Sequence, residues 1–240
     1  MSLKQNLPTA RMVRRMDLTQ DLWLLWLEPS TPFTFKPGQY VTIGTDGIER
    51  AYSIVSAPHE KELELFLELV PEGDLTPRLY RMTSGDLVSM RPTAKGIFTM
   101  DARIVNHVMV ATVTGVAPYV SILRDYLHRA VSGHRFFVLQ GASYQDEFAY
   151  REELEGLVRS RPELIRYVPT VSRPKEPRNH GWDGETGRVH NLLEKHLGHW
   201  ELSPDDTIVY ACGHPGMIEE VKALAKATGY RFKEERFWKQ

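Results

Sequence analysis

The 240-residue sequence contains a single cysteine, Cys212. One cysteine excludes an internal disulfide, a cysteine-ligated iron–sulfur cluster and a Cys-x-x-Cys redox pair within this chain. Electron chemistry in this chain would therefore need a bound organic cofactor.

Long apolar runs and an excess of charge of one sign are also missing. No stretch approaches the ~18 apolar residues of a membrane span, and Met1–Gln5 lacks the apolar run of a signal peptide. The 30 basic and 31 acidic side chains give a formal net charge of −1, so no global field favours nucleic acid or an anionic membrane. Histidines 190, 196 and 199 do not have the spacing of metal ligands. We expect a cytoplasmic protein, a monomer or weak dimer, with no metal and with neither nucleic acid nor membrane as a partner.

Residues 10–100 contain short segments in which apolar and polar side chains alternate with a period of two, which is typical of β-strands. Turn signals such as Lys36-Pro37-Gly38 separate these segments. Six closely spaced strands with only one helix candidate predict a small antiparallel β-barrel. The predicted strands are Arg11–Leu18, Leu22–Glu28, Tyr40–Gly44, Arg50–Val55, Leu63–Val70 and Asp86–Arg91.

After Asp101, apolar strand-like runs alternate with amphipathic helical stretches, which predicts a doubly wound parallel sheet of five strands. We therefore expect a β-barrel domain at residues 1–101 and an α/β domain at residues 102–240. Arg173–Gly187 is rich in proline and glycine and predicts a loop. The predicted strands are His107–Val113, Phe136–Gly141, Ile165–Ser172, Thr207–Cys212 and Arg231–Phe237, and the predicted helices are Pro118–Ala130, Glu147–Ser160, Arg188–His196 and Pro215–Ala227.

The tetrapeptide Arg50-Ala51-Tyr52-Ser53 lies on a predicted strand, where Arg50 and Tyr52 share one face and Ala51 and Ser53 the other. An arginine fork suits a phosphate, an aromatic ring covers a flat heterocycle, and a hydroxyl bonds a ring nitrogen or carbonyl. An ordinary strand with a solvated arginine and a half-buried tyrosine explains the same residues. The tetrapeptide alone leaves both interpretations open.

A glycine- and proline-containing turn, Pro71–Leu79, follows further along the chain. Thr76 is a typical helix N-cap and Pro77 a favoured first helical residue, so the turn predicts the start of a short helix. Free backbone N–H groups at such a start bind phosphate. A routine turn-to-helix junction is the alternative interpretation.

Taken together, the R-x-Y-S strand and the G-x-L-T turn resemble the flavin site of the ferredoxin–NADP reductase family. The resemblance implies that the arginine and the helix start bind the FAD pyrophosphate, while the tyrosine and serine line the isoalloxazine. The FAD-binding residues it implies are Arg50, Ala51, Tyr52, Ser53, Val70, Gly73, Leu75, Thr76 and Thr114.

The segment Ala111–Pro118 joins the first predicted parallel strand to its helix, where a nucleotide pyrophosphate meets a helix N-terminus. It is not Gly-x-Gly-x-x-Gly, and a Gly-x-x-Pro turn is common. The segment resembles the family's TGTGxxP nicotinamide-dinucleotide turn, which implies that Thr114 and Gly115 contact NADP. Val113 stands where that turn has a glycine, and a side chain there keeps the ligand further from the backbone.

The segment Tyr210–Met217 follows the fourth predicted parallel strand and resembles the family's C-G-x-P-x-M signature. The resemblance implies that Cys212 lies beside the nicotinamide and that Gly213 and Met217 belong to the turn and helix that hold the nucleotide. A free cysteine after a buried strand is also commonly a small core residue.

The sequence Glu234–Gln240 resembles the acidic-x-aromatic-aromatic ending of bacterial members of the family, with Lys239 and Gln240 extending past it. Glu235 then corresponds to a carboxylate near the nicotinamide, and Phe237 to an aromatic ring near the isoalloxazine. Trp238 would stack on the FAD adenine. The predicted catalytic residues are Ser53, Cys212, Glu235 and Phe237.

Arginines after the second and third strands of an α/β domain are typical of NADPH sites, because they bind the adenosine 2′-phosphate. Arg173 and Arg188 resemble family positions that hold this phosphate, and Arg178 can join from the loop. Ser143 stands where several relatives carry a third arginine, although a serine still donates one hydrogen bond. We expect NADPH to be preferred over NADH, with solvated loop arginines as the alternative.

These resemblances imply an FAD-dependent ferredoxin (or flavodoxin)–NADP+ reductase. Its reaction is hydride transfer between NADPH and FAD, coupled to one-electron transfer with a small redox protein. One alternative is another NAD(P)H-dependent flavin oxidoreductase of the same superfamily, such as an oxygenase reductase component or a flavin or ferric reductase. The other is a non-catalytic flavin- or nucleotide-binding subunit. The ferredoxin or flavodoxin partner comes from the resemblance alone.

Overall fold

The computed structural model describes residues 7–236, and the chain divides into two compact units. The first unit contains the chain up to Thr99 together with Ala117–Arg129. The second contains Met100–Val116 and the chain from Ala130 onward. Each unit has its own β-sheet and its own hydrophobic core, so each is described by itself.

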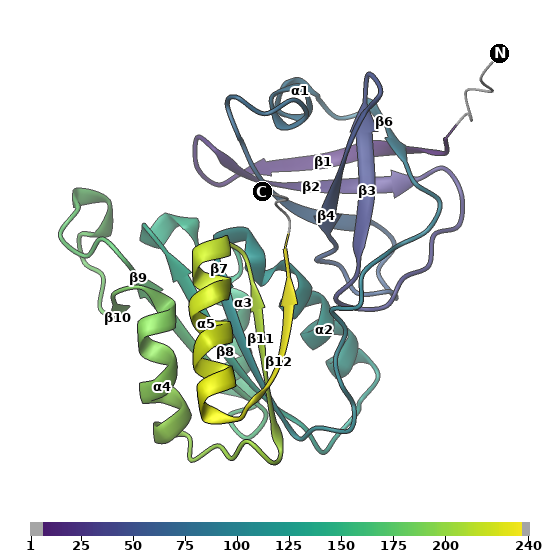
Figure 1. Cartoon of the computed structure of the whole chain (residues 1–240). Helices are drawn as coiled ribbons and strands as arrows, with labels where there is room; N and C mark the ends of the chain where they lie inside the picture. The colour runs from purple at the N-terminus through teal and green to yellow at the C-terminus, as the bar shows by residue number, and fades with distance from the viewer. Residues whose placement is uncertain (1–6, 237–240) are drawn as a thin grey trace. The chain divides into compact units, whose positions relative to one another are not determined.

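The first unit is built on a six-stranded antiparallel sheet in the order β4-β3-β6-β1-β2-β5 (Figure 1). A bridge pairs Ile54 with Leu65, and the Val55 N–H donates to the Glu64 carbonyl at 2.8 Å. These contacts join the two ends of the sheet, which therefore closes into a barrel. The strands are β1 (Thr9–Asp17), β2 (Leu22–Pro29), β3 (Tyr40–Thr45), β4 (Ile48–Ser53), β5 (Leu63–Glu68) and β6 (Leu87–Met90).

The barrel interior is filled by side chains that recur at every second position of a strand. Trp23, Leu25 and Leu27 of β2 are all fully buried, because alternate residues of a strand point to the same face. Burial of each such side chain contributes roughly 1.5–3 kcal/mol, so this face fixes the register of β2.

Within its described residues the first unit has two α-helices, α1 (Thr76–Arg81) and α2 (Ala117–His128). The Ser121 hydroxyl of α2 donates to the Ser56 carbonyl at 2.8 Å, and Arg124 pairs with the buried Glu64 carboxylate at 2.6 Å. These polar contacts tie α2 to the barrel and neutralise a carboxylate that is only 5% exposed.

The second unit is a six-stranded parallel sheet in the order β10-β9-β8-β7-β11-β12 (Figure 1). The strand order reverses at β7, which creates the switch point where α/β proteins bind ligands. The barrel followed by a doubly wound parallel sheet confirms the expected fold class. The strands are β7 (Asn106–Thr112), β8 (Arg135–Ala142), β9 (Ile165–Val171), β10 (Glu185–Thr186), β11 (Thr207–Cys212) and β12 (Arg231–Glu235).

Helices cover both faces of this parallel sheet. Figure 1 shows α4 (Val189–His199) and α5 (Pro215–Thr228) in front of the strands, while α3 (Arg151–Ser160) packs on β9 behind them. Alternate residues of the strands, among them Val110 and Val209, form one core with α4 and α5. No helix in residues 7–236 is long and apolar enough to cross a membrane.

Most predicted strands and helices are shifted by one to three residues at an end, and two segments differ more. The short β10 lies inside the predicted loop Arg173–Gly187, and it adds a sixth strand by pairing two residues with the end of β9. The helix predicted from Glu147 begins instead at Arg151. The chain at Gln145–Glu147 forms the 3₁₀ turn η2, because the Glu147 carboxylate folds back to accept from the backbone N–H groups of Ser143 and Tyr144.

Candidate functional site

The predicted flavin-binding tetrapeptide forms the end of β4 in the first unit. Arg50 and Ala51 are exposed, Tyr52 is half-buried against the barrel core, and Ser53 is buried. Burial raises the pKa of the Tyr52 hydroxyl above its usual range, against the opposing effect of Arg50, so the phenol stays protonated. The chain therefore presents an exposed guanidinium, a neutral aromatic ring and a buried hydroxyl along one short strand.

The predicted glycine turn lies next to this strand. Arg50 Nη2 contacts Asp74 Oδ2 at 2.9 Å, which brings the two motifs together although 24 residues separate them. Gly73 packs tightly in the turn, because a Cβ there would meet the Val70 carbonyl oxygen at 3.0 Å. The structure thus assembles Arg50, Val70 and Gly73 at one place on the barrel.

The start of α1 differs from the prediction that Thr76 is its N-cap. Leu75 is the N-cap residue, and its side chain is buried in the barrel core. The Thr76 hydroxyl instead accepts from the Val70 N–H at 2.9 Å and contacts the Val70 carbonyl at 3.3 Å. The hydroxyl is used to close the turn, so it does not satisfy the first N–H groups of the helix.

Ser53 provides the observation that tests whether a flavin fits this unit. Its hydroxyl oxygen is buried, and it has no hydrogen-bond partner among the described residues. A buried hydroxyl without a partner costs about 1–3 kcal/mol, so such groups generally face a ligand or water. A polar heterocycle beside β4 would supply the missing partner, and the exposed Arg50 guanidinium suits its phosphates. The residues present fit FAD.

A surface hollow of the first unit lies beside the glycine turn, which forms part of its border. It has a volume of about 640 Å³ and is bordered by Gly73 and Asp74 together with residues of the β3–β4 turn and α1. Arg50, Tyr52 and Ser53 are not among its lining residues. The unpaired Ser53 hydroxyl indicates a ligand more specifically than this hollow does, because a buried hydrogen-bonding group requires a polar partner and an open space does not.

In the second unit, two predicted turns meet at the switch point of the sheet. The turn after β7 contains the 3₁₀ segment η1 (Val113–Val116), and the turn after β11 contains Gly213 and His214. A Cβ on Gly115 would lie 2.1 Å from the Cys212 carbonyl oxygen, and a Cβ on Gly213 would lie 2.2 Å from Thr112 Oγ1. Only glycine allows the turns to approach so closely. Gly115, Cys212 and Gly213 are therefore brought together at this point of the sheet.

The side chain of Thr112 connects the two turns through a hydrogen bond. Its hydroxyl accepts from the His214 N–H at 2.7 Å, and Gly213 beside it has a φ of +126° that other residues rarely adopt. Thr112 was not among the predicted site residues, because a threonine at a strand end is common in any sheet. Its role follows only from the pairing of β7 with β11.

Val113 stands in the left-handed region of backbone conformation, with a φ of +42°. A β-branched residue is rarely found there, and the conformation costs about 1–2 kcal/mol. The Val113 side chain packs against a small cluster that contains Phe148 and Val171. The backbone therefore has the shape that a glycine favours, while the side chain is held by packing. Thr114 follows in η1 and is half-buried.

Cys212 and Glu235 are register partners on the neighbouring strands β11 and β12. Cys212 is fully buried, and burial together with Glu235 raises the pKa of its thiol well above the usual value. Burial also raises the pKa of Glu235 to about 7. At neutral pH the thiol is therefore neutral and the carboxyl group is close to half-protonated.

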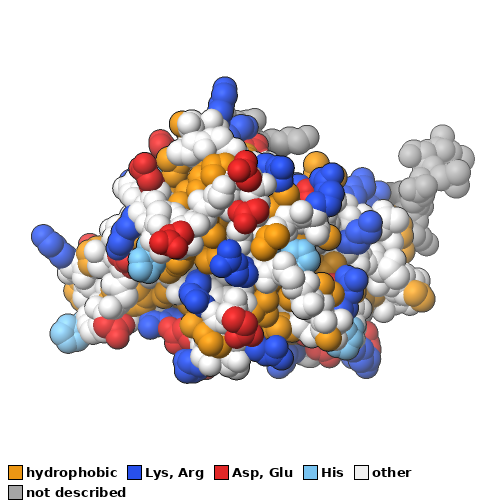
Figure 2. Space-filling view, turned by 90° about the horizontal axis from the view of Figure 1, so that it is seen from below, with side chains coloured by type: hydrophobic (Ala, Val, Ile, Leu, Met, Phe, Trp, Pro, Cys, Tyr) orange, Lys and Arg blue, Asp and Glu red, His pale blue; other side chains and the backbone are white. Residues whose placement is uncertain are grey.

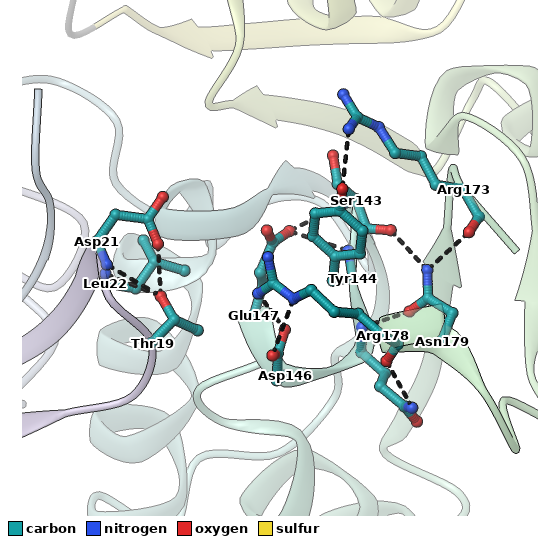
Figure 3. Close-up of polar contacts among 11 residues, drawn as sticks. Thr19, Asp21, Leu22, Ser143, Tyr144, Asp146, Glu147, Arg173, Arg178 and Asn179 are labelled. Atoms are coloured by element: carbon teal, nitrogen blue, oxygen red, sulfur yellow. Dashed lines mark hydrogen bonds and ion pairs between the residues drawn. The ribbon is translucent and has the colours of Figure 1, made fainter. Parts of the chain in front are cut away.

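Two arginines of the predicted nucleotide site, Arg173 and Arg178, follow β9 in the chain (Figure 3). Arg173 is exposed, and its Nη1 donates to the Tyr144 hydroxyl at 2.9 Å. Ser143 lies in the adjacent loop, where its N–H donates to Glu147 at 2.8 Å. Arg188 is exposed at the N-cap of α4, and it forms no ion pair with a described residue.

Asn179 fastens the loops that carry these residues. It is 2% exposed, and its amide nitrogen donates to the carbonyls of Ser143 and Arg173, both at 2.9 Å. Its amide oxygen accepts from the Gln145 N–H at 2.7 Å. Asn179 belongs to the 3₁₀ turn η3 (Pro177–Asn179), and nothing in a proline-rich loop sequence distinguishes it from a solvated asparagine.

Three further predicted residues have simpler placements. Met217 lies in the first turn of α5, is 3% exposed and packs in the core of the second unit. Phe237 and Trp238 lie outside the described residues. Among residues 7–236, His, Cys, Asp and Glu side chains do not form any group of three or more that could hold a metal ion.

The sequence of this chain is similar to those of known reductases. A family model described as an oxidoreductase NAD-binding domain matches residues 109–223. The chain is 32% identical over 212 residues to a ferredoxin–NADP reductase of Pseudomonas aeruginosa, which covers 82% of this chain and 80% of that protein. It is 31% identical over 230 residues to a flavodoxin/ferredoxin–NADP reductase of Escherichia coli, with 89% and 88% covered.

A solved structure shares the fold. The crystal structure of a ferredoxin NADP+ reductase from Neisseria gonorrhoeae with bound FAD and NADP has a TM-score of 0.84 to this chain. The alignment covers 96% of this chain and 98% of that one at 24% sequence identity.

Proposed function

The chain belongs to the ferredoxin–NADP reductase family, and we propose that it exchanges a hydride with NADPH and single electrons with ferredoxin or flavodoxin through bound FAD. As a member of this family it is an FAD-dependent oxidoreductase that uses NADP(H). One observation carries the proposal. The buried Ser53 hydroxyl has no hydrogen-bond partner among the described residues, and the exposed guanidinium of Arg50 lies on the same strand, β4.

We assign FAD binding to the barrel at residues 1–101 and NADP binding to the α/β segment at residues 102–240. In the first segment, Arg50 neutralises phosphate charge, and it would exchange its present contact with Asp74 for that phosphate. Tyr52 covers the flat ring as a neutral aromatic, and Ser53 donates its free hydroxyl to it. Ala51, Val70, Gly73, Leu75 and Thr76 shape the surrounding strand and turn.

In the second segment, the joined turns at Gly115 and Gly213 lie at the switch point of the sheet, which is where a dinucleotide binds in such folds. Cys212 supplies a small neutral side chain, and Glu235 supplies a carboxyl group that holds or releases a proton near neutral pH. Arg173 and Arg188 bind the 2′-phosphate, with Ser143 beside them. Thr114 belongs to both cofactor sites in this assignment, and the roles of Phe237 and Trp238 toward FAD stay predictions.

Bound FAD would supply both hydride and one-electron chemistry to this site. The protein supplies orientation and electrostatics for this exchange. The residues named above bind phosphate, present one hydroxyl and hold one titratable carboxyl group. They supply no nucleophile for covalent chemistry, since the Cys212 thiol is buried and neutral.

The proposal that ferredoxin or flavodoxin is the one-electron partner is based on the names of similar proteins. The similar protein of E. coli is named a flavodoxin/ferredoxin–NADP reductase. On the face shown in Figure 2, Lys and Arg side chains are interspersed with Asp and Glu, so this face presents no field of one sign. A cytoplasmic location and a monomeric or weakly dimeric state stay predictions.

A comparison of electron acceptors tests the proposed function. The purified protein with its flavin is supplied with NADPH and offered ferredoxin, flavodoxin, free flavin and a ferric chelate at matched concentrations. We expect ferredoxin or flavodoxin to be reduced with the highest kcat/KM. The Ser53→Ala variant serves as the control. If all electrons pass through the bound flavin, this substitution should lower the rate of reduction of every acceptor by the same factor.

Two outcomes would contradict this proposal. A higher kcat/KM for free flavin or the ferric chelate would favour the other reductases of the superfamily. Absence of NADPH oxidation with every acceptor, a dye included, would favour a non-catalytic flavin- or nucleotide-binding subunit.

A further inference from the structure

Asp146 occupies the fork of an arginine in the predicted nucleotide site. Its Oδ1 lies 2.7 Å from Arg178 Nη2, and its Oδ2 lies 3.2 Å from Arg178 Nε. Both side chains are nearly half exposed, at 45% for Arg178 and 48% for Asp146. This paired geometry is the one with which an arginine grips a phosphate, so the carboxylate takes the place that a phosphate would use.

The side chain of Tyr144 joins this ion pair to Arg173. The Arg178 guanidinium carbon lies 3.9 Å from the centroid of the Tyr144 ring, and Arg173 Nη1 donates to the Tyr144 hydroxyl at 2.9 Å. Figure 3 shows the ring between the two arginines. Arg173, Arg178 and Asp146 therefore lie together around the Tyr144 ring.

Side-chain hydrogen bonds hold the backbone segments that carry these residues. Gln145 Nε2 donates to the Arg178 carbonyl at 2.9 Å and to the His180 carbonyl at 3.1 Å, while Asn179 holds the carbonyls of Ser143 and Arg173. Asp146 also lies just after β8, the second strand of the parallel sheet in chain order. A carboxylate near the end of the second strand accepts a ribose 2′-hydroxyl in dinucleotide-binding folds.

The arginines of the site differ in whether a carboxylate pairs with them. Arg173 and Arg188 have no carboxylate partner among the described residues, whereas Arg178 is neutralised by Asp146. A 2′-phosphate carries about −1.5 to −2 charges at pH 7, so a neighbouring carboxylate repels it and competes for Arg178. A 2′-hydroxyl has no charge and suffers neither effect.

We propose that Asp146 is a specificity-determining residue that holds Arg178 away from the 2′-phosphate and so narrows the preference for NADPH over NADH. This inference rests on the proposed use of NADP(H) by the site. In the wild-type protein, Arg173 and Arg188 bind the 2′-phosphate, and Arg178 does not contribute to its binding.

The test is a double-mutant cycle with Asp146→Asn and Arg178→Gln in the protein with its flavin bound. Asn keeps the size of the side chain and removes its charge, so Arg178 becomes available. We expect the KM for NADPH to fall about fivefold to twentyfold in Asp146→Asn, with kcat unchanged and the KM for NADH unchanged or higher. Arg178→Gln alone should change the KM for NADPH little, and in the Asp146→Asn background it should abolish the gain.

A binding measurement supplies a readout that does not depend on turnover. Calorimetric titration with 2′,5′-ADP should show about fivefold to twentyfold tighter binding to Asp146→Asn, and titration with 5′-AMP should show no change. Asp17→Asn is the matched control, since it also removes an exposed carboxylate from an arginine, Arg15, on β1 of the other unit. It should alter neither titration.

The outcomes separate this inference from the proposed function. If the wild-type protein oxidises NADPH and Asp146→Asn leaves both the KM ratio and 2′,5′-ADP binding unchanged, the role of Asp146 is refuted while the function stands. A strong loss of NADPH affinity in Arg178→Gln alone would also refute it, because Arg178 would already bind the phosphate. If the wild-type protein oxidises neither nucleotide, the proposed function itself fails.

Discussion

Because the pKa of Glu235 is raised, we expect the free energy of unfolding to depend on pH, which can be measured without any enzymatic assay. An ordinary glutamate has a pKa of 4.5, and burial raises the pKa of Glu235 to about 7. Between these values the folded protein holds a proton that the unfolded chain releases. The free energy of unfolding gained from this group is therefore present below pH 4.5 and is lost as the pH rises through 7.

The magnitude follows from the difference between the two pKa values. At about 1.36 kcal/mol per unit, the upper bound is roughly 3.4 kcal/mol. Because Glu235 is only partly buried, solvent screening reduces this figure, and we expect about 1–2 kcal/mol. Glu235→Gln has no charge at any pH, so it should unfold like the wild type near pH 5 and be about 1–2 kcal/mol more stable near pH 8.5.

Glu234→Gln is the matched control on the same strand. Hydrogen bonds from Arg236, at 2.9 Å, and from Lys222 lower the pKa of Glu234, so this carboxylate stays charged across the same pH window. Its loss should destabilise the protein slightly and by the same amount near pH 5 and pH 8.5. Urea unfolding with saturating FAD at both pH values measures the comparison. An equal effect of Glu235→Gln at the two pH values would refute the reasoning, because Glu235 would then be ionised throughout.

Three other substitutions act on the two cofactor sites. Ser53→Ala should slow flavin reduction by NADPH about 10- to 100-fold in stopped-flow while FAD stays bound, and an unchanged rate would remove the role of the hydroxyl. Gly213→Ala should lower the free energy of unfolding by about 2–4 kcal/mol, since its Cβ would strike Thr112 at a φ of +126°, and a loss below about 0.5 kcal/mol in urea unfolding would contradict the close approach. Val113→Gly should lower the KM for NADPH severalfold because a glycine suits the φ of +42° and lets the ligand approach the backbone, and an unchanged or higher KM would argue against that reason.

The sequence predicted the fold well where local patterns carry the information. Alternating apolar residues located the barrel strands, and Thr207–Cys212 was predicted with the bounds that the structure gives β11. Apolar runs and helical periodicity likewise located the parallel sheet. The two-residue β10 was missed, because so short an edge strand exists only through its pairing with β9.

Contacts between distant segments were beyond the reach of the sequence. Thr112 joins a turn 102 residues away, and Asn179 fastens a loop 36 residues away, yet each is an ordinary polar residue in its local context. The Thr76 hydroxyl closes onto Val70 although its position favours an N-cap, because the buried Leu75 takes the cap position. In each case tertiary geometry overrode the local preference.

The most direct test of the central claim is stopped-flow reduction of the purified protein by NADPH and by NADH in turn. The account predicts a yellow protein whose oxidised flavin absorbance is bleached by both nucleotides, with a higher kcat/KM for NADPH. A colourless protein, or a yellow one whose flavin NADPH does not reduce, would contradict it. A clear preference for NADH would overturn the phosphate-binding roles assigned to Arg173 and Arg188.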